Sequence, residues 1–295
     1  MDVTFKKYPN LKEFLSEFTA NITSAIQVRS IILFGGIMLD DFSKRYSDID
    51  IVVVLEKGLR PKTHEAVKEA IKKLYEIDAD FAKILYVYFI PFYMIESPKE
   101  EFKLMDGSIL GYENFSYFGK YPLSIMDDFS IREKGKILFG EDLRNQFPEP
   151  PKDCFWKMFM DSILPIEKAM ELYPFHHSSV RNARTAVNWL LYFPRLIYSL
   201  LHKDIIGKSD SAFWFQKEYN NPLGEFLVEI AKCRQEDAFI HDVKDLVLNS
   251  RKLILFTLEK ILEIKGVDAN LSNLVSIDLF RMNFYPVFRE FKELI

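Results

Sequence analysis

The stretch that most constrains the fold is Asp-Ile-Asp-Ile-Val-Val-Val-Leu, residues 48–55. Its second half is apolar and almost entirely β-branched, which is typical of a central, buried strand. The same strand begins with two carboxylates, Asp48 and Asp50. Residues i and i+2 of a strand point to the same face of the sheet. The two carboxylates therefore project together at the margin of a dry core, where they would repel each other and lose hydration.

A divalent cation resolves both problems. Two carboxylates offer only oxygen ligands, which suits Mg²⁺, and Mg²⁺ usually takes phosphate oxygens as further ligands. Gly35 and Gly36 stand upstream, separated from Asp48 by 11 residues. Paired glycines let a ligand approach bare backbone N–H groups, a common way to hold phosphates. This spacing predicts a site for a nucleotide and a metal ion, with Asp48 and Asp50 as metal ligands and the glycines as phosphate cradle.

A plainer interpretation stays open at this point. Ser-Asp before a strand is ordinary turn chemistry, and Asp50 would then lie on a solvated edge. The Asp40-Asp41 pair between the glycines and the strand is predicted to be a solvated turn, with Lys44 and Arg45 as possible phosphate contacts. A bare Asp-x-Asp proves little; the glycines, the spacing and the apolar strand together favour the functional interpretation.

Composition excludes several classes of protein. A net charge of −4 over 295 residues, with pI near 5.8, gives no basic surface for long nucleic acids, although a local basic pocket for a phosphate ligand is compatible with it. The two cysteines, Cys154 and Cys233, make neither a disulfide framework nor a zinc site. No signal-peptide core and no uninterrupted apolar run of membrane length is present, so we expect a cytoplasmic protein with no membrane partner.

The first half of the chain reads as a small α/β domain. Apolar residues at helical spacing predict a helix over 11–26, and a second helix is expected to begin near Pro61. Short apolar runs predict strands at 30–36, 48–55 and 84–90. Residues 91–120 are expected to form a looser segment that wraps the sheet. A helix over residues 125–135 and a strand over residues 136–140 complete this part.

A proline-rich linker divides the chain. Residues 147–153 contain Pro148, Pro150 and Pro151, which forbid a helix through them. We therefore expect a domain over 1–147 and a second one over 148–295. The second reads as an all-α bundle, with predicted helices over residues 154–173, 180–203, 209–218, 223–234 and 239–263. The path of the tail 266–295 is not assigned.

The glycine pair with Asp48 and Asp50 resembles the motif of the nucleotidyltransferase superfamily that includes DNA polymerase β. The chain is most similar to the streptomycin/spectinomycin adenylyltransferases, and the similarity spans about residues 10–265. Its second specific part is Asn188, then Arg195, Tyr198 and Ser199, then Lys208. The resemblance implies an α+β nucleotidyltransferase fold followed by a helical domain, with the active site between them. It also implies Mg²⁺, ATP as the nucleotide donor and a hydroxyl-bearing small molecule as acceptor.

Arg195 has a physical interpretation of its own. It interrupts an apolar helix, and a buried arginine needs an anionic partner. Its planar fork suits phosphate. In the family the positions that match Arg195 and Lys208 contact the nucleotide triphosphate. The alternative is an ion pair within the protein, which the residues alone leave equally open.

The chain departs from the family in three places. Gly36 stands where the family usually has serine, and Thr185 stands where it has an acidic residue for the acceptor. The family's general base is a glutamate on the third strand, where this chain offers only residues 83–85, none of them acidic. Asp80 serves only if that strand begins earlier than predicted. The missing acid predicts nucleotide binding without robust adenylylation of streptomycin or spectinomycin.

Other functions remain as alternatives. A nucleotide-binding protein that has lost transferase activity would keep the same site. Arg195 and His202 form the R-x₆-H spacing of HEPN ribonucleases, and residues seven apart share a helix face. His176 and His177 resemble metal ligands only superficially, because adjacent histidines on a helix point to different sides.

Overall fold

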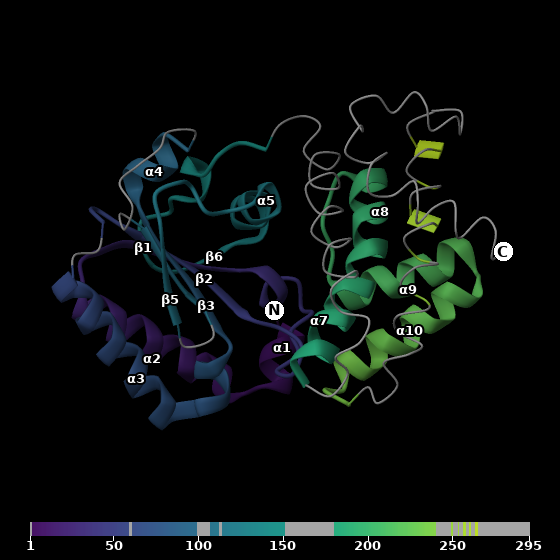
Figure 1. Ribbon diagram of the computed structural model, residues 1–295, viewed down its shortest axis with the longest axis horizontal. Coiled ribbons are helices and arrows are strands. Elements are labelled where there is room, and N and C mark those ends of the chain that lie inside the picture. Colours follow the sequence, from purple (N-terminus) through teal and green to yellow (C-terminus); the bar gives the residue numbers. More distant parts are fainter. Residues whose placement is uncertain are drawn as a thin grey trace.

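The computed structural model describes residues 2–58, 61–98, 107–111, 114–150 and 180–239, together with isolated residues between 249 and 264. Its described part contains a sheet with helices on both faces and, beside it, a group of helices (Figure 1). The expected fold class, an α+β nucleotidyltransferase domain followed by a helical region, is confirmed. The boundary between residues 147 and 148 stays a prediction.

The sheet has six strands in the order β5-β4-β3-β2-β1-β6. β2 and β3 are parallel, and every other neighbouring pair is antiparallel. The strands are β1 Val28–Phe34, β2 Ile49–Leu55, β3 Leu85–Pro91, β4 Gly107–Gly111, β5 Asn114–Phe118 and β6 Lys136–Gly140. β2 therefore lies in the interior of the sheet, as its β-branched sequence predicts.

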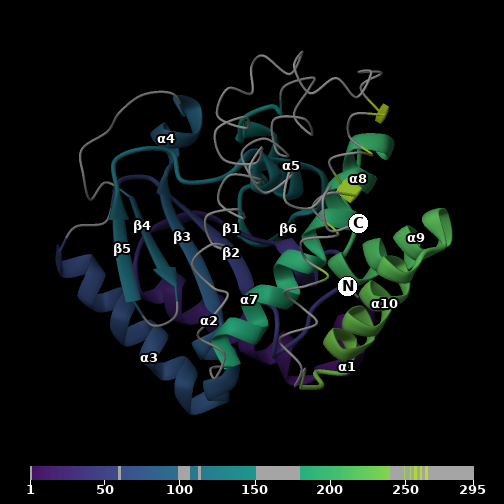
Figure 2. The same cartoon turned by 45° about the vertical axis from the view of Figure 1, so that its right-hand side comes forward.

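Helices cover both faces of this sheet (Figure 2). They are α1 Asp2–Lys7, α2 Asn10–Ala25, α3 Pro61–Lys83, α4 Phe92–Glu96 and α5 Ile125–Lys134, with short turns η1 Gly35–Ile37 and η2 Arg144–Gln146. Ile51 and Val53 of β2 pack in the core under α2 and α3. Val52 and Val54 pack in the opposite core, under α4 and α5. Because side chains alternate along a strand, Asp50 projects to the α5 face.

The helical region consists, in its described part, of α7 Val180–Leu190, α8 Tyr192–His202, α9 Lys208–Tyr219 and α10 Pro222–Gln235. Their apolar sides form a separate core around Leu196, Phe215 and Leu227. Tyr46, from the loop that precedes β2, is only 2% exposed and inserts into that core. Its hydroxyl donates to the Ala238 carbonyl oxygen over 2.6 Å. A side chain of the sheet domain thus anchors the two parts to each other.

Some elements differ from their predicted limits. Residues 91–120 contain α4, β4 and β5 rather than a loose wrap, because Gly-rich and aromatic residues there extend the sheet at its edge. The expected helix over 180–203 is two helices that meet at Leu191. A proline within a helix removes a backbone donor, and Pro194 lies in the first turn of α8, where that donor is not needed.

Other expectations lie outside the described residues. These are the helix over 154–173, His176 and His177, most of the helix over 239–263, and the tail 266–295. Residues 148–150 of the proline-rich linker are described and belong to no helix or strand. Within the described ranges no helix is both long enough and apolar enough to cross a membrane.

Candidate active site between the sheet and the helices

The glycine turn and β2 meet at one point. β1 ends at Phe34, and Gly35 follows with φ of +72°, a conformation that favours glycine. A Cβ atom at residue 35 would lie 2.2 Å from Asp50 Oδ2. The Asp50 carboxylate therefore packs directly against the backbone of the turn. The Gly35 N–H donates to Ser130 Oγ over 3.3 Å, which ties α5 to the same turn.

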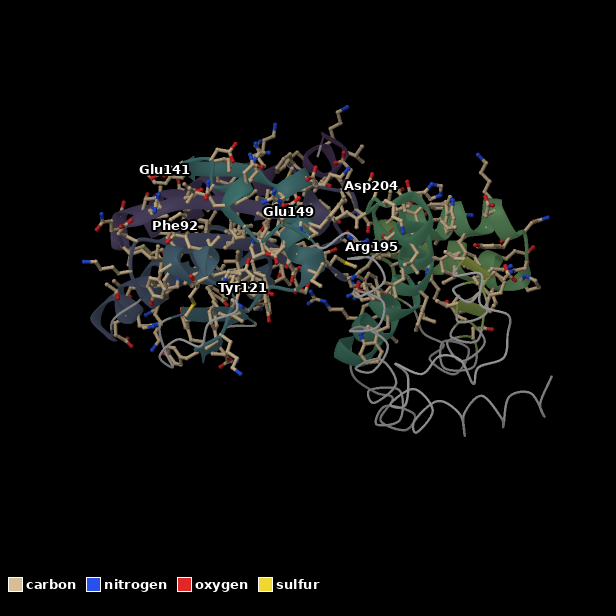
Figure 3. All side chains as sticks on the ribbon, turned by 90° about the horizontal axis from the view of Figure 1, so that it is seen from above. Phe92, Tyr121, Glu141, Glu149, Arg195 and Asp204 are labelled. Atoms are coloured by element: carbon tan, nitrogen blue, oxygen red, sulfur yellow. The ribbon has the colours of Figure 1, made fainter. Side chains whose placement is uncertain are left out.

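A cavity of about 250 Å³ opens at this point, between the sheet domain and the helices. The described residues that line it come from both sides, and Figure 3 shows Arg195 on the helical side of the boundary. They are Gly35, Gly36, Leu39, Asp41, Tyr46, Ser47, Asp48, Asp50, Met126, Asp127, Ser130, Asn188, Tyr192, Arg195, Lys208 and Arg234. The structure thus brings together Gly35, Gly36, Asp48, Asp50, Arg195 and Lys208, as the sequence predicts.

Two carboxylates of this cavity, Asp50 and Asp127, lie in surroundings that disfavour their charged forms. Burial raises the pKa of Asp50 well above its usual value, and the charges of Asp48 and Asp127 raise it further. Burial likewise raises the pKa of Asp127. A bound divalent cation would relieve this repulsion, so the residues fit Mg²⁺ at Asp48 and Asp50. In the described ranges, no three His, Cys, Asp or Glu side chains surround one point suited to a metal ion.

Arg184 of α7 already contacts one of the expected metal ligands. Its Nη2 atom lies 2.5 Å from Asp48 Oδ1 and 2.6 Å from the Ser47 carbonyl oxygen. The two side chains are 14% and 29% exposed, so water screens the pair only in part. Sequence reasoning missed Arg184, since nothing in its local pattern distinguishes it from a surface arginine. The helical region thus places a cation where a metal ion is expected.

Two more cations face the cavity from the helices. Arg195 is 8% exposed, and its Nε atom has no hydrogen-bond partner among the described residues. Burial lowers the pKa of Arg195. Burial, together with the charges of Arg234 and Arg195, lowers the pKa of Lys208 to about 7. The Lys208 ammonium donates to Asn188 Oδ1 over 3.3 Å. Buried cations with spare hydrogen-bonding capacity fit an anionic ligand such as a triphosphate.

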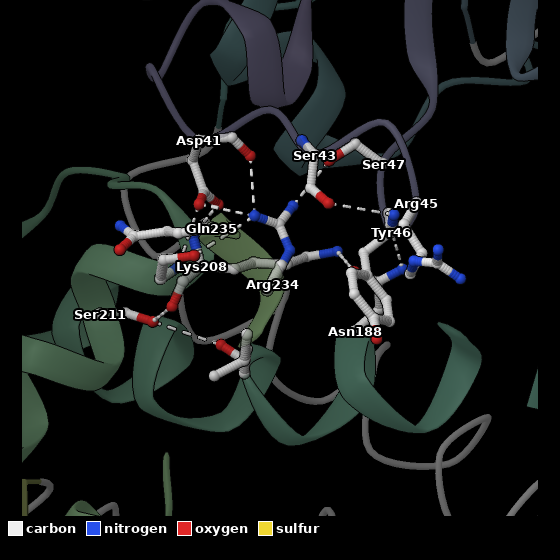
Figure 4. Close-up of polar contacts among 12 residues, drawn as sticks. Asp41, Ser43, Arg45, Tyr46, Ser47, Asn188, Lys208, Ser211, Arg234 and Gln235 are labelled. Carbon is white, nitrogen blue, oxygen red and sulfur yellow. Dashed lines mark hydrogen bonds and ion pairs between the residues drawn. The ribbon is translucent and has the colours of Figure 1, made fainter. Parts of the chain in front are cut away.

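A buried ion pair fixes the wall of the cavity (Figure 4). Arg234 of α10 and Asp41 are joined by a 2.6 Å contact, and their side chains are 3% and 4% exposed. Asp41 also accepts from the backbone N–H groups of Lys208 and Ser209, over 2.6 and 3.3 Å, so it caps α9 from the other domain. The predicted solvated turn at Asp40-Asp41 is therefore wrong for Asp41, because α10 supplies the guanidinium that its carboxylate needs when buried.

The third strand begins at Leu85, one residue later than predicted. The residue beside Asp50 on β3 is Tyr86, not residue 83, 84 or 85. Residues 61–83 form α3, with non-helical dihedral angles at Asp78, so Asp80 lies in a helix before the strand. The Asp80 side chain is 69% exposed, pairs with Lys44 over 3.1 Å and does not line the cavity. The structure therefore does not bring Asp80 to the other predicted site residues.

Three further candidates lie elsewhere. Lys44 pairs with Asp78 as well as Asp80, and Arg45 donates to the Asp237 carbonyl oxygen. Neither residue lines the cavity. His202 is exposed and packs against the rings of Tyr198 and Trp214. Arg195 and His202 thus do not share the described cavity, and the ribonuclease alternative gains no support from their positions.

Comparison with known proteins agrees with this geometry. Residues 11–110 match the family model described as a nucleotidyltransferase domain, a class of transferase enzymes. That range contains the glycine turn, Asp48 and Asp50. The resemblance to nucleotidyltransferases is thereby confirmed, as is the expectation of an enzyme of that class. No curated protein matches the chain.

Among solved structures, the chain is similar to the spectinomycin adenyltransferase AAD(9) from Enterococcus faecialis, determined with ATP and spectinomycin. The TM-score is 0.62 and the sequence identity 18%, and the alignment covers 84% of this chain and 99% of that chain. The likeness therefore extends beyond the nucleotidyltransferase domain into the helical region, and it shows a shared fold.

Proposed function

We propose that the protein transfers an adenylyl group from magnesium-bound ATP to a hydroxyl group of a small molecule. The observation that carries the proposal is the joint position of Asp48, Asp50, Arg195 and Lys208 around one interdomain cavity. Carboxylates stand on the sheet side and buried cations on the helical side. A metal-bound triphosphate presents the complementary arrangement of charges.

Each residue has a role in this proposal. Asp48 and Asp50 would hold Mg²⁺, which when bound supplies Lewis-acid stabilisation of charge at phosphate. Gly35 and Gly36 both line the cavity and carry no side chains, which would let phosphate oxygens approach the turn. Arg195 and Lys208 would bind the triphosphate and stabilise the charge that develops on pyrophosphate as it departs.

Thermal stability with a panel of nucleoside triphosphates, with and without Mg²⁺, tests the proposal. We expect ATP with Mg²⁺ to raise the melting temperature, and Asp50→Asn to lose most of this shift. Arg195→Ala should weaken ATP binding about ten- to a hundredfold, which corresponds to the loss of a charge-assisted hydrogen bond of about 1.5–3 kcal/mol. If both variants bind Mg–ATP as the wild type does, the assignment of the site is wrong.

The second candidate is a nucleotide-binding protein without transferase activity. It is favoured by the absence of a carboxylate beside Asp50 on β3, where Tyr86 stands. Nucleotide binding without release of pyrophosphate would single it out.

A further inference from the structure

Transfer of a nucleotidyl group to a hydroxyl requires a proton acceptor. The acceptor oxygen forms a bond to the α-phosphorus, the bond from that phosphorus to the bridging oxygen of the leaving pyrophosphate breaks, and the hydroxyl proton must go to a base. β3 supplies none. Tyr86 stands beside Asp50, and burial raises the pKa of Tyr86 and Tyr88, so both phenols stay protonated at neutral pH.

Four carboxylates line the described cavity: Asp41, Asp48, Asp50 and Asp127. Asp41 is held by Arg234 and by two backbone N–H groups of α9. Asp48 and Asp50 are the expected metal ligands, and Arg184 contacts Asp48. Of the four carboxylates, Asp127 alone is neither paired with an arginine nor expected to bind the metal ion.

The position of Asp127 is set by the start of α5. Ser124 begins the helix with a capping box, in which Asp127 Oδ2 accepts from the Ser124 N–H over 3.0 Å and from its hydroxyl over 2.7 Å. No hydrogen bond reaches Oδ1 from any described residue, so one oxygen is available to a ligand. The helix itself is fixed against the glycine turn by the hydrogen bond from Gly35 N–H to Ser130 Oγ.

Asp127 is not placed as a third ligand of the same metal ion. Asp48, Asp50 and Asp127 do not surround a common point, since the described residues hold no cluster of three metal-ligating side chains. Asp127 lines the same cavity as Asp48 and Asp50, so an acceptor hydroxyl bound in that cavity would have a carboxylate in its surroundings that is not an expected metal ligand. The titratable and charged groups that interact electrostatically with Asp127 are Asp50, Tyr86, Tyr88, Tyr121, Asp128 and Arg195.

We propose that Asp127 is the general base that takes the proton from the acceptor hydroxyl, so that α5 supplies the carboxylate that β3 lacks. This inference rests on the proposed adenylyl transfer. The missing acid on β3 is the reason for expecting weak turnover. If Asp127 of α5 is the base, that reason no longer holds.

The test compares Asp127→Asn with Asp128→Asn in the full chain. Asp128 is the adjacent carboxylate, buried and hydrogen-bonded to Tyr121, and it does not line the cavity. Two quantities are measured: the melting-temperature shift caused by Mg–ATP, and the release of pyrophosphate with water, spectinomycin or streptomycin as the acceptor. Asp127→Glu, which keeps the carboxylate, serves as the rescue variant.

We expect Asp127→Asn to keep the Mg–ATP shift and to lose about 10²–10⁴-fold in the rate of pyrophosphate release, the usual contribution of a general base. The wild-type rate should fall with acidification, and this dependence should disappear in Asp127→Asn. Asp128→Asn should stay within a few-fold of wild type, and Asp127→Glu should recover part of the rate.

Two results would overturn the inference while leaving the proposed function intact. One is wild-type turnover in Asp127→Asn; the other is loss of Mg–ATP binding in that variant, which would make Asp127 a metal ligand. A wild-type protein that binds Mg–ATP yet releases no pyrophosphate with any acceptor contradicts both the base and the transferase. Absence of Mg–ATP binding by the wild type contradicts the proposed function itself.

Discussion

The carboxylate of Asp50 occupies the space that a side chain at residue 35 would fill: a Cβ there would lie 2.2 Å from Asp50 Oδ2. Gly35, which follows β1, and Asp50, the second residue of β2, are therefore in direct contact. Gly35 has φ of +72°, whereas at Gly36 the nearest atom to an added Cβ is the Asp41 carbonyl oxygen, at 3.4 Å. The two glycines of the motif thus have different constraints.

Gly35→Ala should abolish Mg–ATP binding, because it displaces a metal ligand and strains the backbone. A left-handed conformation for a non-glycine residue costs of order 1–3 kcal/mol, which should also lower the unfolding free energy. Gly140→Ala is the matched control: Gly140 has a similar φ of +80° but does not line the cavity, so this variant should keep most of the Mg–ATP-induced melting-temperature shift. Equal behaviour of the two variants in this assay would show that the contact between Gly35 and Asp50 is unimportant.

How far the sequence predicts this site depends on which contacts are local. The sequence predicts that Gly35, Asp48 and Asp50 lie together, because side chains alternate along a strand and a glycine turn precedes it. These contacts are set by the motif alone. Arg184 and Arg234 are missed because their partners, Asp48 and Asp41, lie more than a hundred residues away in the chain. No local pattern marks an arginine that pairs across a domain boundary.

The third strand also shows that contacts between distant parts of the chain cannot be predicted from local sequence. Its existence follows from the apolar run, but its register against β2 depends on where α3 ends. α3 continues to Lys83, and the pairing then aligns Tyr86 with Asp50. Since one residue of shift exchanges the two faces of a strand, the sequence predicts the strand but not the side chain beside Asp50.

Arg184 is expected to compete with metal ions for Asp48. Removing it by Arg184→Ala frees the carboxylate and deletes a nearby positive charge, so the nucleotide-free protein should bind Mn²⁺ about ten- to a hundredfold more tightly. Titration calorimetry with Mn²⁺ measures the change. Arg144→Ala, which breaks an exposed pair with Asp142, is the control and should leave Mn²⁺ affinity unchanged. Unchanged affinity in Arg184→Ala would mean that this contact does not oppose metal binding.

The pair of Asp41 and Arg234 should dominate the attachment of the helical region to the sheet domain. Removing one partner of a buried ion pair costs about 3–5 kcal/mol, because the other charge stays buried. We therefore expect Arg234→Met to lower the unfolding free energy in urea by roughly this amount. Lys134→Ala, which breaks a half-exposed pair with Asp204, should cost below about 1 kcal/mol. Similar losses in both variants would place the attachment elsewhere, for instance at Tyr46.

Nucleotide binding should be accompanied by proton uptake at Lys208. In the nucleotide-free protein its pKa is about 7, chiefly because of burial, so at pH 8 most molecules carry a neutral amine. A triphosphate beside this amine favours the charged form and raises its pKa. Binding at pH 8 must then take up close to one proton, and the affinity should decrease as pH rises above 7.

Calorimetric titration of Mg–ATP in two buffers of different ionisation enthalpy measures the number of protons taken up. The measurement is made at pH 8, where the nucleotide itself does not change protonation. Lys208→Met should abolish the uptake and weaken binding. At pH 6 Lys208 is already charged in the free protein, so the wild type should take up almost no proton there through this residue. An uptake at pH 8 that persists in Lys208→Met would assign the proton to another group of the cavity, of which Asp127, whose pKa is raised by burial, is the first to substitute.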